Sequence, residues 1–101
     1  MYGITVVVVD GEDASRTSLL WALRRLGLRA LGVDTLADAT ALLEALDADA
    51  VLVHGDEDEG TLAPLRARTS VVQVPRAAPV DEVVVELLRA LGRPEAAATL
   101  N

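Results

Sequence analysis

Short apolar runs rich in β-branched residues alternate along the chain with longer stretches in which apolar residues recur at helical spacing. The runs predict strands. The first is apolar throughout, which is typical of a parallel strand buried on both faces. Four such runs occur, over residues 4–9, 28–33, 50–53 and 70–74.

The stretches between these strands predict four helices. The first has Asp13 or Ser15 as its N-terminal cap and runs to about Leu26, where Gly27 ends it. The second is capped by Asp34 or Thr35 and has an apolar face made of Leu36, Ala39, Leu42, Leu43 and Leu46. The other two are expected over residues 61–68 and 80–91, the last ending at Gly92.

Strands that alternate with helices predict a parallel sheet wound by right-handed crossovers. We expect an α/β protein of the flavodoxin-like, three-layer type, in the order βαβαβαβα, with four strands arranged 2-1-3-4. A five-stranded sheet is the alternative. In this order the loops after Val9 and Val53 lie side by side, at the edge where such proteins bind ligands. Residues 1–92 are expected to form one domain and residues 93–101 a flexible tail.

Composition narrows the classes of function. The chain has 101 residues, no cysteine and a net charge of −7. The lack of cysteine excludes disulfides, thiolate metal sites and cysteine nucleophiles. The negative charge argues against nucleic acid or a membrane surface as the partner. The start of the chain lacks the basic segment of a signal peptide, and no apolar run approaches the ~20 residues of a membrane span. A cytoplasmic protein is expected.

Acidic residues follow the first and third strands. The predicted fold brings to one edge Asp10, Glu12, Asp13, His54 and Asp56. Two carboxylates after the first strand and a third after the third strand would hold Mg²⁺ through oxygen ligands. However, His54 occupies that third position, and imidazole is a poor Mg²⁺ ligand. Asp56 would replace it only if the loop bent back. The competing interpretation is a solvated acidic loop. We expect no cofactor, with weak Mg²⁺ binding as the alternative.

His54 is the only histidine of the chain, so no histidine cluster exists to bind zinc. No spacing pattern joins it to a serine or threonine nucleophile. The loops also lack the glycine spacing of a phosphate-binding motif. We interpret His54 as a hydrogen-bonded structural residue at a strand end, and we expect no enzymatic activity.

Trp21 is the one large aromatic residue in a predicted helix. The core face of that helix is made of Leu19, Ala22, Leu23 and Leu26. Leu20 falls at the flank of this face and Trp21 nearly opposite it. An exposed Trp beside an exposed Leu favours a contact surface for another protein, with Arg25 and Arg29 at its rim. A cation–π contact of Trp21 with a neighbouring arginine is the alternative.

Three segments of the chain resemble the receiver domain of bacterial two-component response regulators. "VVVVDGEDASRTSLLWALRRLGL" is similar to the first strand, acidic pair and first helix of that family, and "DTLADATALLEALDADAVLVH" to its second helix and third strand. "VVQVPRAAPVDEVVVELLRALG" is similar to its last strand and helix. The resemblance covers residues 4–54 well, and it implies a role in signalling.

Against the receiver pattern, the pocket is degenerate. Asp10 matches the first acid of the family pair, whereas Gly11 stands for the second, with Glu12 as a partial substitute. His54 falls where the family has its phosphoacceptor Asp, and Val74 where it has a Lys before Pro. The chain is also short by about one strand–helix unit. The resemblance therefore implies a pseudo-receiver that does not carry phosphate.

A missing strand–helix unit would leave the strand at 70–74 as a sheet edge with unpaired backbone groups. We expect a second copy or another protein to cover it, so a homodimer is predicted, with Val74 and Val85 in the contact.

Two other families share the four-strand plan. The B-type domains of sugar phosphotransferase systems carry phosphate on a Cys where this chain has Asp10, and cobalamin-binding domains carry a His where it has Glu12. Three functions follow. The first is a phosphorylation-independent protein-interaction module. The second is a phosphoacceptor or phosphocarrier that uses Asp56 or His54. The third is a self-assembling structural subunit.

Overall fold

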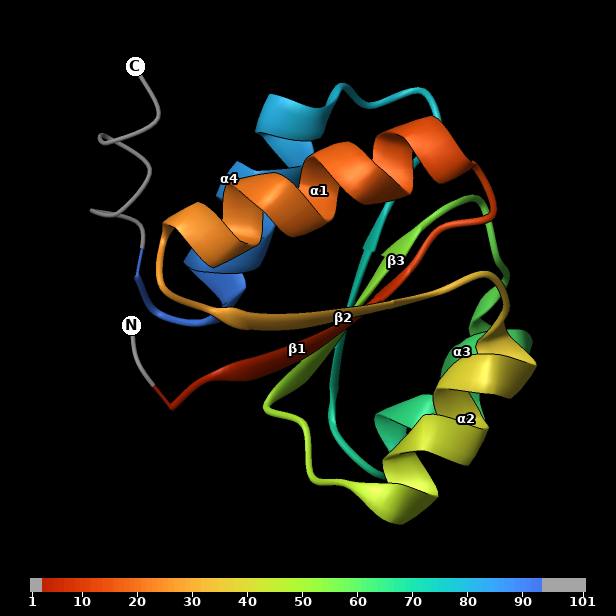
Figure 1. Cartoon of the computed structure of the whole chain (residues 1–101). Helices are drawn as coiled ribbons and strands as arrows, with labels where there is room; N and C mark the ends of the chain where they lie inside the picture. The colour runs from red at the N-terminus through yellow and green to blue at the C-terminus, as the bar shows by residue number, and fades with distance from the viewer. Residues whose placement is uncertain (1–2, 94–101) are drawn as a thin grey trace.

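The computed structural model describes residues 3–93, which fold as strands alternating with helices (Figure 1). The elements, in chain order, are β1 (Thr5–Val9), α1 (Asp13–Arg25), β2 (Arg29–Val33), α2 (Leu36–Ala45), β3 (Ala50–His54), α3 (Glu59–Arg66), β4 (Ser70–Val74) and α4 (Val80–Ala90). The order confirms the predicted alternation. Apart from Arg93, the predicted tail lies outside the described residues.

The strands form one parallel sheet in the order β2-β1-β3-β4. This is the predicted order, and within residues 3–93 the sheet has four strands and not five. Val9 pairs with Val33 on one side and with Val53 on the other. The ends of β1 and β3 are therefore neighbours, so the residues that follow these two strands meet at one edge.

Helices cover both faces of the sheet, which gives three layers (Figure 1). One core lies between the sheet and the pair α1 and α4, where Leu19, Leu23, Leu87 and Leu88 are fully buried. The second core lies under α2 and α3. β1 and β3 contribute to both cores because alternate side chains point to opposite faces. The central strands are therefore apolar in every position up to their ends.

Two helices end as the glycines predicted. Gly27 and Gly92 both have positive φ, +88° and +74°. After α1 the Leu28 amide donates to the Leu23 carbonyl, and after α4 the Arg93 amide donates to the Leu88 carbonyl. These are Schellman endings, in which a left-handed residue lets the chain turn back onto the last carbonyls of the helix.

Three helix ends differ from the predictions. The predicted side-chain cap of α1 is wrong: Glu12 holds the cap position and makes no side-chain cap bond, and Ser15 lies in the first turn, where its hydroxyl donates to Asp10. The third helix begins earlier than predicted, since Asp58 accepts the amide of Thr61. α2 ends at Ala45, and Leu46 has extended backbone beyond the helix. Thr35 caps α2, which confirms one of the two predicted caps.

On each outer strand of the sheet, an arginine donates a hydrogen bond to a backbone carbonyl that points away from the sheet. The Val33 carbonyl of β2 faces β1, where it accepts from the Asp10 amide. Backbone groups of alternate residues point to opposite sides of a parallel strand. The carbonyl of Ala30 therefore points outward, and the Arg24 guanidinium donates to it from 2.8 Å.

The opposite edge has the same device. The Val74 carbonyl of β4 accepts from the Gly55 amide on the β3 side, so the Val71 carbonyl points outward. Arg66 of α3 donates to it from 2.9 Å, while its other nitrogens pair with Glu59. In each case the helix that precedes the edge strand supplies the arginine. Exposed strand edges invite pairing with other chains, and these two are partly occupied.

No helix among residues 3–93 is long and apolar enough to cross a membrane.

Candidate functional site

Asp10 is the centre of a polar cluster at the carboxyl-terminal edge of the sheet. It follows β1 directly and is 1% exposed. Its Oδ1 accepts from the Glu12 amide at 2.9 Å and from Arg76 Nη1 at 2.9 Å. Its Oδ2 accepts from the Ser15 hydroxyl and lies 3.0 Å from His54 Nδ1. Both carboxylate oxygens thus have two partners each.

These contacts determine the charge of Asp10. Burial alone would raise the pKa of this carboxyl, but hydrogen bonds from Ser15, the Glu12 amide, His54 and Arg76 outweigh it and lower the pKa below its ordinary value of 3.8. Asp10 is therefore a buried carboxylate at neutral pH, and its charge is balanced inside the protein.

His54 bridges two parts of the chain from the end of β3. It is 4% exposed, its Nδ1 lies 3.0 Å from Asp10 Oδ2, and its Nε2 lies 3.0 Å from the carbonyl of Ala78. Both partners are acceptors, so the ring satisfies both only when each nitrogen carries a hydrogen. The prediction that His54 is hydrogen-bonded at a strand end is confirmed. His54 is also poorly placed to accept phosphate, because neither nitrogen is free.

Arg76 and Ser15 are the two residues of this cluster that were not predicted as part of the pocket. Arg76 lies in the loop between β4 and α4, and its Nη1 contacts Asp10 and approaches the Ser15 hydroxyl at 3.4 Å. A signal was present: Arg76 directly follows Pro75, in the region where the receiver resemblance places a cation beside a Pro. The receiver pattern places its cation at Val74, one residue before the Pro, and not at Arg76.

The other acids expected in this pocket are not drawn into it. Glu12 contributes its backbone amide and has an exposed side chain. Asp13 pairs with Arg16, which also pairs with Asp34 at 2.6 Å and donates to the Asp10 carbonyl at 2.7 Å. The predicted group of five therefore divides: the side chains of Asp10 and His54 are in direct contact, Glu12 reaches Asp10 only through its backbone amide, and Asp13 and Asp56 bind other groups.

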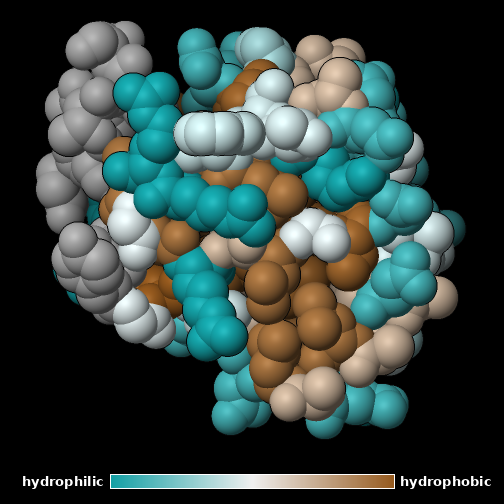
Figure 2. All heavy atoms as spheres, viewed as in Figure 1, coloured by the Kyte–Doolittle hydropathy of each residue, from teal (hydrophilic) through white to brown (hydrophobic). Residues whose placement is uncertain are grey.

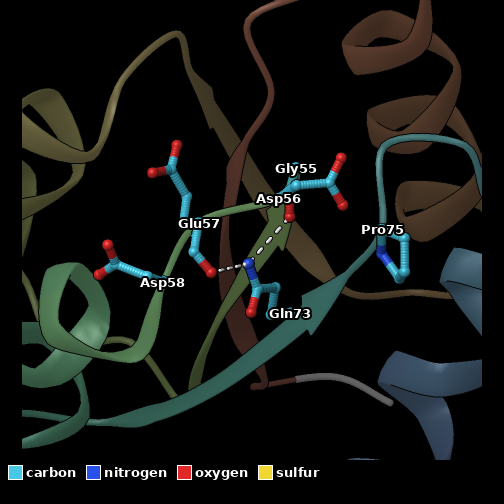
Figure 3. A pocket seen from close by; sticks show the side chains of 6 residues that line it. All are labelled: Gly55, Asp56, Glu57, Asp58, Gln73 and Pro75. Atoms are coloured by element: carbon cyan, nitrogen blue, oxygen red, sulfur yellow. Dashed lines mark hydrogen bonds between the residues drawn. The ribbon is translucent and has the colours of Figure 1, made fainter.

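Asp56 belongs to an acidic loop that lies against β4. Figure 3 shows this loop, where Asp56, Glu57 and Asp58 line a cavity of about 450 Å³ together with Gln73 and Pro75. The Gln73 amide holds the loop by donating to the carbonyls of Gly55 at 3.0 Å and Glu57 at 2.6 Å. The acidic side chains spread apart around the cavity (Figure 3).

Two of the loop's acids have identified local partners. Asp56 accepts from the Arg76 amide at 3.4 Å, so the loop does bend back, but toward the backbone and not toward Asp10. Asp58 caps α3, and the amide and hydroxyl of Thr61 lower its pKa. Within residues 3–93, no group of three acidic or histidine side chains is arranged to hold a metal ion.

The expected interaction residues have different environments. Trp21 is 67% exposed, as predicted, and Arg25 is exposed beside it. Leu20 is half-buried because it lies over Gly32 of β2: a Cβ on that glycine would meet Leu20 Cδ1 at 2.9 Å. Val85 is half-buried on α4. The expectation for Val74 needs correction, because its side chain is 4% exposed and packs in the core under α1 and α4.

The sequence matches no protein-family model, and no curated protein matches it. Among solved structures, the chain is similar to the solution structure of the beryllofluoride-activated NtrC receiver domain, with a TM-score of 0.69 and 18% sequence identity. The match covers 91% of this chain and 97% of that one. The receiver-like fold predicted from the resemblance is thereby confirmed, and at this identity the likeness shows the fold alone.

Proposed function

We propose that this protein is a receiver-like signalling module that acts by protein contact and does not use phosphorylation. In this proposal it is a cytoplasmic, non-enzymatic pseudo-receiver, shortened by about one strand–helix unit, and it needs no cofactor. Nucleic acid and membranes are not its partners, because its net charge of −7 opposes both.

The observation that carries the proposal is the saturation of Asp10. A carboxylate that is to bind a metal ion and a phosphoryl group needs free oxygen lone pairs and an acceptor side chain within reach. Here Arg76, His54, Ser15 and the Glu12 amide use the oxygens of Asp10. The position of the phosphoacceptor is filled by His54, whose nitrogens both face acceptors. These contacts of Asp10 and His54 support the proposal that the pocket stabilises the fold and does not bind a phosphoryl group.

Protein contact is supported by the exposed Trp21. Large aromatic side chains gain much from burial at an interface, and an isolated exposed Trp costs the monomer solubility without adding to its core. The β4 edge supports contact less well, because the Val74 side chain is buried and Arg66 occupies the outward carbonyl of Val71.

The test of the non-phosphorylated state is treatment with acetyl phosphate and Mg²⁺, followed by intact mass spectrometry. We expect no added phosphoryl group, while a functional receiver domain treated in parallel gains one. A phosphoryl group on this protein would overturn the proposal. Its loss in Asp56→Asn but not in His54→Gln would then assign Asp56 as a phosphoacceptor, and the reverse pattern would assign His54.

The test of protein contact is sedimentation equilibrium of the wild type beside Trp21→Ala and Val85→Asp. Circular dichroism first checks that each variant is folded. A wild-type homodimer that dissociates in Val85→Asp but not in Trp21→Ala would place the contact on α4, and the opposite pattern would place it on α1. A wild-type monomer leaves contact with a different protein as the expected mode. A large homogeneous assembly unaffected by either change would favour a self-assembling structural subunit and would contradict the proposal.

A further inference from the structure

We propose that one side of the molecule, formed by α1 and the edge of β2, binds an acidic segment of a different protein that also carries apolar side chains. We call this surface the α1–β2 face and define it by Leu20, Trp21, Arg25, Arg29 and Leu31. The inference rests on the proposed function, contact with another protein, and adds the chemistry of the partner.

Charge is the first observation. Between Asp13 and Asp34 the chain contains no acidic residue, although it has 16 acids in all and a net charge of −7. Every charged residue in this interval is an arginine: Arg16, Arg24, Arg25 and Arg29. The interval covers nearly the whole of α1 and β2. Arginine is thus the only charged residue type over most of α1 and β2, although the protein as a whole is acidic.

Only part of that charge is used inside the protein. Arg16 pairs with Asp13 and Asp34, and the Arg24 guanidinium donates to the outward carbonyl of Ala30. Arg25 and Arg29 are both exposed, and among the described residues neither makes an ion pair. Their donors are therefore available to carboxylates, which a guanidinium binds in a bidentate fashion.

Apolar surface adjoins these arginines. Trp21 is 67% exposed, and Leu20 is half-buried over Gly32 on the α1 side of β2. Leu31 is half-buried on the opposite, α2 side of the same edge strand. Figure 2 shows hydrophobic side chains gathered over β2 and toward α2, with hydrophilic side chains along the border of the patch. An apolar patch with a charged rim is the usual anatomy of a protein contact. The partner therefore needs apolar side chains for the patch and carboxylates for the rim.

A second copy does not fit this face. In a two-fold dimer the same patch meets itself, so Arg25 and Arg29 of one copy would face those of the other. Like charges brought together at an interface are unfavourable. The face is complementary to negative charge, and a different protein with an acidic, partly apolar segment satisfies both the arginines and Trp21.

The experiment is selection of a random peptide display library on the folded wild-type protein. We expect the recovered peptides to be enriched in Asp and Glu beside large apolar residues. Trp21 is the only Trp of the chain, so a recovered peptide that lacks Trp should shift its fluorescence on binding. Raising the salt concentration should weaken binding, because the rim contacts are exposed charges.

Variants locate the binding. Arg25→Glu combined with Arg29→Glu keeps the fluorescent reporter, and we expect it to weaken a recovered peptide by more than about tenfold. Arg68→Glu combined with Arg89→Glu makes the same change of charge elsewhere, and we expect it to change affinity by less than about twofold. Circular dichroism compares the folding of the two variants.

Three outcomes would overturn the inference: recovery of neutral or basic peptides, equal loss of binding in both double variants, or no enrichment at all. Peptides without acidic residues that still lose binding in Trp21→Ala would disprove the partner's chemistry and leave the proposed contact function standing. Phosphoryl uptake from acetyl phosphate would instead disprove the proposed function. Concentration-dependent burial of Trp21 without peptide would identify a second copy as the occupant and contradict the inference.

Discussion

The carboxyl-terminal edge of the sheet and the α1–β2 face use their charged groups in opposite ways. At the edge, Asp10, His54 and Arg76 bind one another, and the first two are almost completely buried. On the α1–β2 face, Arg25 and Arg29 point to solvent beside an exposed Trp21. In the first region the charged groups are hydrogen-bonded to one another within the protein. In the second region the arginine side chains have no such partner within the described part of the chain and can bind another molecule.

This difference teaches where to look for function in such a chain. The carboxyl-terminal edge of the sheet has acidic and histidine residues where such proteins have reactive sites, but here these residues bind one another. The α1–β2 face has no residue pattern of a catalytic site, but its arginines are available to bind a partner. Variants at the edge should therefore change stability, and variants on the face should change binding while the stability stays almost constant.

The largest effect is expected for Asp10→Ala. It removes the carboxylate that His54 and Arg76 share, and it leaves the buried imidazole without its partner. We expect the free energy of unfolding to fall by about 3 kcal/mol, below the upper range for buried pairs because Arg76 is partly exposed to water. Urea denaturation measures this. Asp47→Ala, an exposed acid in a loop, is the matched control, and an equal loss in both variants would contradict the assignment.

The pH dependence of stability sharpens the same point. The pKa of Asp10 in the folded protein is below its ordinary value of 3.8. Its contribution is therefore fully present above that ordinary value and is lost as the pH falls through the lower folded pKa. We expect Asp10→Asn to be less stable at neutral pH and to show a shallower loss in acid than the wild type. Parallel acid limbs in denaturation between pH 2 and pH 5 would refute this prediction.

A smaller effect is expected for His54→Leu, which removes the partner of the Ala78 carbonyl and leaves Asp10 Oδ2 with the Ser15 hydroxyl alone. The cost should be about 1–3 kcal/mol. Hydrogen exchange should show faster opening in the loop between β4 and α4, with α2 unaffected. Exchange that accelerates equally in α2 would argue against the local bridge.

Next in size are Arg24→Ala and Arg66→Ala, which uncover the outward carbonyls of Ala30 and Val71. Each should lower the free energy of unfolding by about 1 kcal/mol. Light scattering at high concentration should also show more association than in the wild type, because a free sheet edge is exposed. Arg68→Ala, which removes only a surface ion pair with Glu44, is the control. If Arg24→Ala and Arg66→Ala associate no more than Arg68→Ala, these arginines do not protect the strand edges from pairing.

The smallest effect on stability is expected for Trp21→Ala. Its side chain is 67% exposed, so unfolding free energy should change by less than about 0.5 kcal/mol. Thermal denaturation followed by circular dichroism measures this. A loss above about 1.5 kcal/mol would show that Trp21 is packed against the fold and would remove the contrast between the two regions.

The sequence predicted the fold well because its signals are local. The strand at Ser70–Val74 and the helix endings at Gly27 and Gly92 depend on β-branched runs and on left-handed glycines. Alternation predicted a parallel sheet, and the order 2-1-3-4 was expected as that of the flavodoxin-like and receiver-like fold. The cap of α1 was missed because the helix begins at Asp13, with Glu12 at the cap position, so that Asp13 and Ser15 both lie in its first turn.

The site was predictable only in part. The adjacency of Asp10 and His54 followed from strand order, since the two strands are neighbours. The contact between Arg76 and Asp10 joins residues 66 positions apart through a long side chain on a loop. The hydrophobic pattern of the sequence does not predict which group a long side chain on a loop will contact. The edge arginines Arg24 and Arg66 were missed for the same reason.

The two edge arginines also limit how copies of this protein can join. One outward carbonyl on each edge strand already accepts a hydrogen bond from an arginine. Extension of the sheet by strands of another copy is therefore disfavoured. Assembly through side-chain faces, which have a fixed shape and charge, is favoured over the open-ended growth that bare strand edges permit.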